Sequence, residues 1–204
     1  MKNIRKFSKS KHAKPTKYLS MLILSFICQI SVAQSDYNKE IKAHREKYKA
    51  DFISDENSPL KKADIQYLDF FEANESYKVK CKFILGGKSD PFEIPTSNGQ
   101  TKTYTRFGQL KFKIAGKKQK LTVYRSLVLM KNPLYKDYLF IPFKDKTSGR
   151  STYGGGRYLD LRMADLNADN IFLDFNKAYN PYCAFSTGYS CPIPPEENNL
   201  KISI

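Results

Sequence analysis

The chain has 204 residues, 41% of them hydrophobic and 14% aromatic, which is enough to build a buried core of ordinary size. Its formal net charge of +15 comes from 35 basic and 20 acidic residues and raises the question of a nucleic-acid partner. With only two histidines and no tryptophan, the composition excludes a histidine-rich zinc site and weighs slightly against carbohydrate binding.

The first 33 residues are predicted to be a signal peptide. Seven basic residues and no acid precede an apolar run over residues 18–32, and Ser31 and Ala33 occupy the −3 and −1 positions of the expected cleavage site. The run is too short for a comfortable membrane span, so we expect none after cleavage, with an uncleaved anchor as the alternative. Because Ile27 precedes Cys28, a lipoprotein signal is not favoured. We expect an exported protein, periplasmic or extracellular.

Cleavage removes seven positive charges and lowers the net charge from +15 to +8. The remaining lysines are spread along the chain and do not cluster on one helix, which favours a solvated basic surface and no specific nucleic-acid partner. Weak binding to anionic polymers or envelope surfaces stays open. Residues 34–204 contain no obvious linker, so we predict a single β-rich domain.

The mature chain begins with its only long predicted helix, over residues 36–52, with Asp36 or Ser35 as the cap. Its apolar stripe consists of Tyr37, Ile41, His44, Tyr48 and Phe52. His44 is the sole imidazole that remains after cleavage, and its place on the stripe favours an interior or rim position over a role in catalysis.

After the helix, the hydrophobic period changes to two, which predicts short strands with one buried face. Turn residues such as Gly86-Gly87, Asn98-Gly99 and Gly116 separate the strands. This spacing favours an antiparallel barrel or roll of about eight short strands over a βαβ fold. The alternating segments cover residues 79–85, 110–114, 121–123, 139–143, 159–163, 171–175 and 200–204.

Cys183 and Cys191 are the candidate disulfide, because an oxidising compartment would favour closing the seven-residue loop between them. The functional alternative is a thiolate nucleophile or a soft-metal ligand, although two thiolates alone make a poor metal site. Cys81 takes an inward position in an alternating strand and is most simply a small core residue.

The glycine run in Tyr153–Tyr158 is a second candidate feature. Consecutive glycines can expose backbone N–H groups to an anion, and Arg157 could clamp a carboxylate or phosphate. The structural alternative is a glycine bulge, with Arg157 paired to Asp145, Asp160 or Asp174. The three aspartates could also supply acid–base or metal chemistry, although capping or solvation explains each of them equally well.

Several strings in the chain carry a resemblance: Ser58-Pro59-Leu60, PFKDKTSG at 142–149, TYGGGRY at 152–158, DFNKAYNPYC at 174–183 and CPIPPEEN at 191–198. They resemble a bacterial family known only as a domain of unknown function, over nearly all of the mature chain. The resemblance implies no activity, and family members include apparently exported and apparently cytosolic proteins.

The hypothesis for function is the binding of a small anionic ligand, fixed by an arginine and flanked by a wall of tyrosines. We expect no cofactor and no metal, and assign no catalytic residue. The predicted ligand-binding residues are Arg157, Tyr158, Asp174, Asn176, Tyr179, Asn180 and Tyr182.

Two alternatives remain open. One is a hydrolase-type enzyme that uses Cys183 as nucleophile or Asp174 as acid or base. The other is an envelope structural or interaction protein, which an exposed apolar edge strand over residues 200–204 would favour.

Overall fold

The computed structural model describes the backbone of residues 17–167 and 170–204 and the side chains of residues 36–167 and 170–204. Its contacts define two compact units, one ending at Lys39 and one from Glu40 to Ile204. The site discussed below lies in the second unit. The signal peptide and its cleavage stay predictions, and residues 1–16 lie outside the described residues.

The predicted helix is present but starts earlier than expected. Helix α1 spans Lys17–Ser54, so Asp36 lies inside it and, in place of a cap, forms a 3.0 Å ion pair with Lys39. In the second unit Ile41 and Phe52 are buried and Tyr48 is half-buried, whereas His44 is exposed. Within the described part of the chain, no helix is long and apolar enough to cross a membrane.

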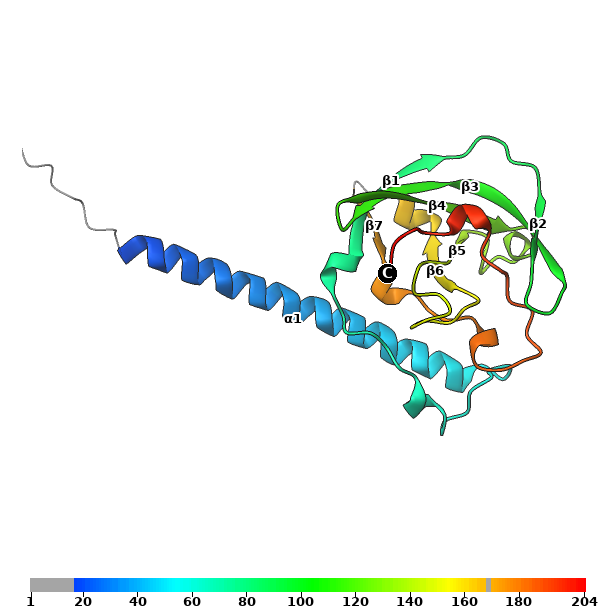
Figure 1. The fold of residues 1–204 in the computed structure, drawn as a ribbon, viewed down its shortest axis with the longest axis horizontal. Coiled ribbons are helices and arrows are strands. Elements are labelled where there is room, and N and C mark those ends of the chain that lie inside the picture. Colours follow the sequence, from blue (N-terminus) through cyan, green and yellow to red (C-terminus); the bar gives the residue numbers. More distant parts are fainter. Residues whose placement is uncertain (1–16, 168–169) are drawn as a thin grey trace, which may run out of the picture. The chain divides into compact units, whose positions relative to one another are not determined.

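Seven antiparallel strands form one curled sheet in the order β6-β5-β4-β3-β1-β7, with β2 paired to β3 (Figure 1). This confirms the predicted mainly β barrel or roll with one amino-terminal helix. The strands are β1 (Lys78–Leu85), β2 (Phe92–Pro95), β3 (Thr101–Ile114), β4 (Lys117–Ser126), β5 (Tyr138–Phe143), β6 (Arg157–Arg162) and β7 (Ile171–Asp174).

One strand was missed, one was assigned wrongly, and β3 begins nine residues before the predicted segment 110–114. The short β2 was missed, and its Pro95 fits the end of an edge strand, where no ladder N–H is needed. The expected last strand, residues 200–204, is an irregular strap beside the end of β5, bonded from Leu200 N to Lys144 O at 2.8 Å and from Lys146 N to Ile202 O at 2.9 Å. Its apolar residues alternate because Leu200 and Ile202 are buried in the main core. The exposed apolar edge strand that would have favoured an interaction protein is therefore not formed by these residues.

The sheet buries hydrophobic clusters on both of its faces. The main core lies on one face, and a smaller aromatic core lies on the other, made of Ile94, Tyr104, Tyr124, Phe140 and Tyr158. Strand β3 serves both cores because a β-bulge between Arg106 and Gly108 shifts its register. Without the extra residue, Tyr104 and Leu110 would point to the same face.

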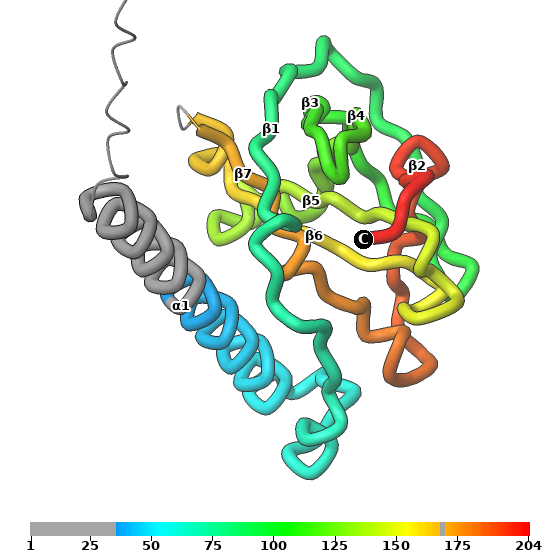
Figure 2. The backbone as a smooth tube through the Cα atoms, turned by 60° about the vertical axis from the view of Figure 1, so that its left-hand side comes forward, coloured from blue at the N-terminus to red at the C-terminus, as the bar shows by residue number. Residues whose placement is uncertain are grey.

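Strands β4 and β5 pair only through Tyr124 and Phe140, and the carboxy-terminal segment fills the gap that this leaves. Asn198, in the 3-10 helix η7 (Glu196–Asn198), is fully buried, accepts a bond from Thr122 N (2.7 Å) and donates to Thr122 O (2.9 Å) and Pro142 O (2.8 Å). Figure 2 shows this segment, orange to red, returning along the sheet. One amide thus joins two strands that share a single ladder pair.

Candidate functional site

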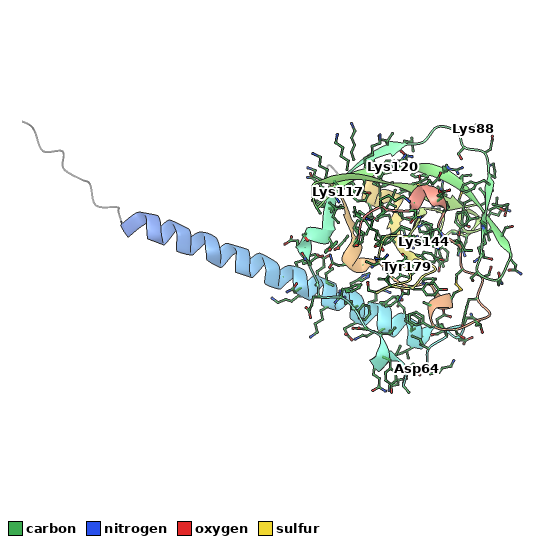
Figure 3. All side chains as sticks on the ribbon, in the orientation of Figure 1. Asp64, Lys88, Lys117, Lys120, Lys144 and Tyr179 are labelled. Carbon is green, nitrogen blue, oxygen red and sulfur yellow. A yellow bond between two sulfur atoms is a disulfide. The ribbon has the colours of Figure 1, made fainter. Side chains whose placement is uncertain are left out.

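A cavity of about 840 Å³ opens in the second unit and is the candidate site. Its wall combines the last turns of α1, the loop after it, the turn before β6 and the segment after β7. Tyr179, labelled near the middle of the domain in Figure 3, lies in this wall. The residues used below are Arg45, Tyr48, Tyr67, Phe70, Phe71, Asn74, Thr147, Arg150, Tyr153, Arg157, Asn176, Tyr179, Asn180, Phe185 and Ile204.

Arg157 is the most buried charged group of the cavity wall, with 7% of its surface exposed. Its Nη2 donates to Asp145 Oδ2 at 2.7 Å and to Ile204 O at 3.1 Å, and its guanidinium lies 5.2 Å from the ring centre of Phe143. Burial lowers the pKa of Arg157, and the Asp145 carboxylate partly opposes this shift. Its buried Nε finds no hydrogen-bond partner among the described residues.

Asp145 is itself anchored from several sides. Its carboxylate accepts from Thr147 N at 2.8 Å, from the Thr147 hydroxyl, and from Ile204 N at 3.1 Å. Of the three aspartates that could have paired with Arg157, the structure therefore selects Asp145. The pair is held rigidly because both charges are buried and the carboxylate oxygens are bonded.

The helical side of the wall is aromatic and basic. Arg45 donates from Nη2 to Phe71 O at 2.8 Å and lies 5.0 Å from the ring centre of Phe70. Tyr48 packs edge-on against Phe70 and lies 6.0 Å, centre to centre, from Tyr179. Burial raises the pKa of Tyr48, so its phenol stays neutral at physiological pH.

Asn176 fastens the loop over the cavity. Its Oδ1 accepts from Asn74 N and its Nδ2 donates to Asn74 O, both at 2.9 Å, as a backbone pair in a sheet would. Asp174 in turn accepts from the backbone N of Asn176 at 3.0 Å and caps the 3-10 helix η5 (Phe175–Lys177). The DFN string thus has a structural role: Asp174 ends β7 and caps η5, and Asn176 holds the loop at Asn74.

The structure brings four of the seven predicted ligand-binding residues to the cavity wall: Arg157, Asn176, Tyr179 and Asn180. Tyr158 points to the opposite face of β6, as strand alternation requires, and donates to Pro192 O at 2.5 Å inside the aromatic core. Asp174 is a helix cap, and Tyr182 donates to Asp55 Oδ2 at 2.7 Å beside Phe52.

Sequence reasoning missed the contribution of α1 and of residues 67–74 to the wall. No local pattern marks them, because Arg45 and Tyr48 read as ordinary helix positions and the loop has no motif. Long-range bonds place them here, between Asn74 and Asn176, between Tyr48 and Asn180 O (3.4 Å), and between Arg45 and Phe71 O.

The predicted disulfide between Cys183 and Cys191 is confirmed, with 6.2 Å between the Cα atoms. Its loop docks on Ser97, which donates from its backbone N to Cys191 O and from its hydroxyl to Tyr189 O, both at 2.9 Å. Cys81 is buried as expected, and burial raises its thiol pKa to about 11. Neither sulfur of the disulfide is a thiolate in this form.

The three aspartates do not form a common acid–base or metal site. Asp145 pairs with Arg157, Asp174 caps η5, and Asp160 accepts from Tyr138 (2.7 Å) and Tyr179 (2.9 Å). Burial raises the pKa of Asp160 against the opposing effect of those two hydroxyls. Among the described residues, no group of three or more His, Cys, Asp and Glu side chains is arranged to hold a metal ion.

Fold and cavity together define a mainly β domain in which the end of one helix and the loops beside the sheet form a pocket with arginine and aromatic side chains in its wall. Residues 63–204 match the family described as a protein of unknown function, DUF1684, and the chain belongs to this family. The predicted family resemblance is thereby supported, although its bacterial origin is not.

One similar solved structure is the solution NMR structure of an uncharacterized protein from Haloarcula marismortui. It is 31% identical to this chain, with a TM-score of 0.64, and the match covers 84% of this chain and 93% of that one. A search of curated proteins found no match.

Proposed function

We propose that the protein is exported, is cleaved after Ala33, and binds a small organic anion with an aromatic or apolar part in the cavity. The observation that carries the proposal is the cavity itself, of about 840 Å³, with a buried arginine and aromatic rings in its wall. This volume is within the range of small-molecule sites, which combine apolar walls with a few polar groups that fix orientation.

Three arginines outnumber Asp69 and Glu72 in the cavity wall, and this excess of positive charge supports an anionic ligand. Arg157 is offset by Asp145, but Arg150 has no ion pair among the described residues and is exposed at the cavity. A guanidinium can bind a carboxylate or phosphate with two parallel hydrogen bonds, which fixes both position and orientation. Arg150 would therefore bind the anionic group of the ligand directly, while Arg157 would orient the turn that carries Arg150.

Two buried polar atoms in the wall support the same proposal. Arg157 Nε and Asn180 Oδ1 have no hydrogen-bond partner among the described residues. Buried polar groups are rarely left unpaired, because each costs about 1–3 kcal/mol. We expect a ligand or ordered water to approach these groups after small side-chain movements.

Apolar walls complete the argument. Tyr48, Phe70, Tyr153, Tyr179 and Phe185 line the cavity and present ring surface to an occupant. Aromatic rings bind flat apolar groups at low entropic cost because they have few rotatable bonds. The enzyme alternative has less support, since Cys183 is in a disulfide and Asp174 caps a helix.

The first test is the intact mass of the protein, purified without reductant, under native and denaturing conditions. We expect an adduct that appears only in the native spectrum, is kept in the charge-matched control Lys131→Gln, and is lost in Arg150→Gln. Equal retention by both variants would contradict the role of Arg150, and an adduct that survives denaturation would point to a covalent modification.

The second test uses known probes, so that it does not depend on a co-purified ligand. Phenyl phosphate and benzoate should raise the melting temperature of the wild type, whereas benzyl alcohol, which has no charge, should raise it much less. If neither anion stabilises the protein up to millimolar concentration, the proposed ligand class is wrong.

A further inference from the structure

A grid of six lysines covers part of the outward face of the sheet. The register pairs Lys82 with Lys111 and Lys111 with Lys120 in one row across β1, β3 and β4. Two residues further along, Lys113 pairs with Lys118, and the same β1–β3 register extends this second row to Lys80. We name the lysine face by these members: Lys80, Lys82, Lys111, Lys113, Lys118 and Lys120.

All six side chains are exposed, because they alternate with core residues such as Cys81, Phe112 and Leu121. Figure 3 labels Lys120 near the turn of the β3–β4 hairpin, among side chains that project outward from the ribbon. Directly opposed residues on neighbouring strands have Cβ atoms about 4.5–5.5 Å apart, and residues two apart on one strand are about 7 Å apart.

Among the described residues, none of the six lysines has an ion pair. The carboxylate that interacts with Lys120 is that of Glu197, which already pairs with Arg106 at 2.9 Å. Like charges placed directly opposite each other on a sheet are destabilising. The face therefore concentrates positive charge, and an external anionic partner would reduce the repulsion between the lysines.

The grid has an apolar border along β7 and β1. Phe172 is the cross-strand partner of Lys80 and is 45% exposed, and Ile84 follows Lys82 on the same face of β1 and is 40% exposed. An array of lysines on a sheet with exposed apolar residues at its edge suits a lipid surface, where ammonium groups meet headgroups and apolar tips enter the boundary.

We infer that the lysine face is a docking surface for an anionic lipid bilayer. The chemistry is charge complementarity with phosphate headgroups, spread over two strand rows. Nucleic-acid binding would favour a groove with arginines and several stacking rings, whereas the six charged members of this face are all lysines and Phe172 is a single ring at its border. This surface is independent of the cavity, whose wall contains none of the six lysines.

The test compares co-sedimentation of the full chain with vesicles of phosphatidylglycerol mixed into phosphatidylcholine and with vesicles of phosphatidylcholine alone. The patch variant carries Lys82→Gln, Lys111→Gln and Lys120→Gln, and the matched control carries Lys61→Gln, Lys131→Gln and Lys201→Gln. Each lysine near an anionic surface contributes about fivefold to the partition coefficient, so we expect about a 100-fold loss for the patch variant at low salt and a much smaller loss for the control. Equal losses would overturn the inference, since they would show a general charge effect.

A footprint separates this face from any binding by the basic amino terminus, which all variants share. Acetylation of lysines in the wild type, read by mass spectrometry with and without anionic vesicles, should show protection of the six lysines and none at Lys61, Lys131 and Lys201. Protection confined to the amino terminus would overturn the inference. Protection of the six by a DNA oligonucleotide and not by vesicles would assign the face to nucleic acid and equally overturn it.

Discussion

At the scale of single residues, the pair of Arg157 and Asp145 shows how one buried arginine serves structure before it serves binding. The two side chains are 9% and 0% exposed, so removal of the arginine leaves a buried carboxylate without its counter-charge. From the sequence, Arg157 could be a clamp for a ligand or the structural partner of an aspartate. The geometry makes it the structural base of the cavity wall.

We predict that Arg157→Ala lowers the free energy of unfolding by about 3–5 kcal/mol, because it leaves the buried carboxylate of Asp145 without its counter-charge. Urea denaturation followed by circular dichroism measures this loss. The double variant Arg157→Ala with Asp145→Ala should lose less than the sum of the two single changes. Strict additivity would argue against coupling between the two side chains.

Gly156 is the one glycine of the TYGGGRY string that backbone geometry requires. Its φ of +93° lies in the left-handed region, and an added Cβ would come within 2.6 Å of Phe143 O. The glycine lets the turn after Tyr153 enter β6 close to β5. The string is thus a tight structural turn, and Arg157 follows directly from it.

We predict that Gly156→Ala destabilises the protein by at least about 1–3 kcal/mol through backbone strain and contact with Phe143 O. Gly87→Ala is the control, since nothing lies within 4 Å of an added Cβ there and its φ is not positive. Thermal unfolding of the two variants should differ clearly; similar melting temperatures would show that the turn relaxes.

At the scale of elements, η7 closes the sheet where β4 and β5 separate. Asn198→Ala removes three buried hydrogen bonds and leaves Thr122 N, Thr122 O and Pro142 O without that partner. We predict a loss of about 2–4 kcal/mol, since unsatisfied buried groups cost about 1–3 kcal/mol each and partial relaxation recovers some of it. Denaturant unfolding measures it, and the exposed neighbour Asn199 provides the control Asn199→Ala, expected to be near neutral.

The same short helix carries a pH-dependent contact. Burial alone would raise the pKa of Glu197, but hydrogen bonds from Arg106 and Tyr124 outweigh it and hold the pKa below its ordinary value of 4.5. A carboxyl group with a lowered folded-state pKa stabilises the fold above the pKa of the unfolded chain. That contribution is lost as the pH falls through the folded-state pKa.

We therefore predict that Glu197→Gln destabilises the protein more at pH 7 than at pH 3. Half-exposure of the pair keeps the effect within about 1 kcal/mol. Unfolding free energies of wild type and variant at both pH values check this, with Glu196→Gln as the neighbouring control. A difference that grows toward pH 3 would contradict the assigned sign.

At the scale of the whole molecule, the carboxy-terminal segment, residues 183–204, wraps the sheet. It pairs with Pro95–Ser97, spans β4 and β5 through Asn198, and ends beside Lys144–Lys146. The disulfide ties the start of this path into a loop. Because native contacts through Ser97 hold the same loop, the disulfide acts mainly on the unfolded chain.

We predict that the double variant Cys183→Ser and Cys191→Ser keeps the fold but loses about 2–3 kcal/mol, the entropy of closing a loop of this length. Its far-ultraviolet circular dichroism should match that of the wild type, while its denaturation midpoint falls. The wild type measured with and without reductant is the control and should show the same difference. Loss of the folded spectrum would mean that the disulfide shapes the native state itself.

The sequence determined the secondary-structure class, because hydrophobic alternation needs only local reading. Segments such as residues 79–85 and 139–143 were placed correctly, and Cys183 and Cys191 were paired from their short spacing and the expected oxidising compartment. A strand and an irregular segment that both bury every second side chain have the same hydrophobic pattern. The sequence could therefore not distinguish them, and residues 200–204 were wrongly assigned as a strand. In residues 200–204, as in a strand such as β1, buried and exposed side chains alternate.

Only the tertiary structure decided which residues share a site or a face. Arg157 and Tyr158 are neighbours in sequence but face opposite cores, whereas Arg45 and Asn176 are far apart in sequence and line one cavity. The six lysines of β1, β3 and β4 looked dispersed along the chain and gather only through strand register. Local pattern fixes which way a side chain points within its own strand, but neighbours across strands depend on pairing, which no local pattern encodes.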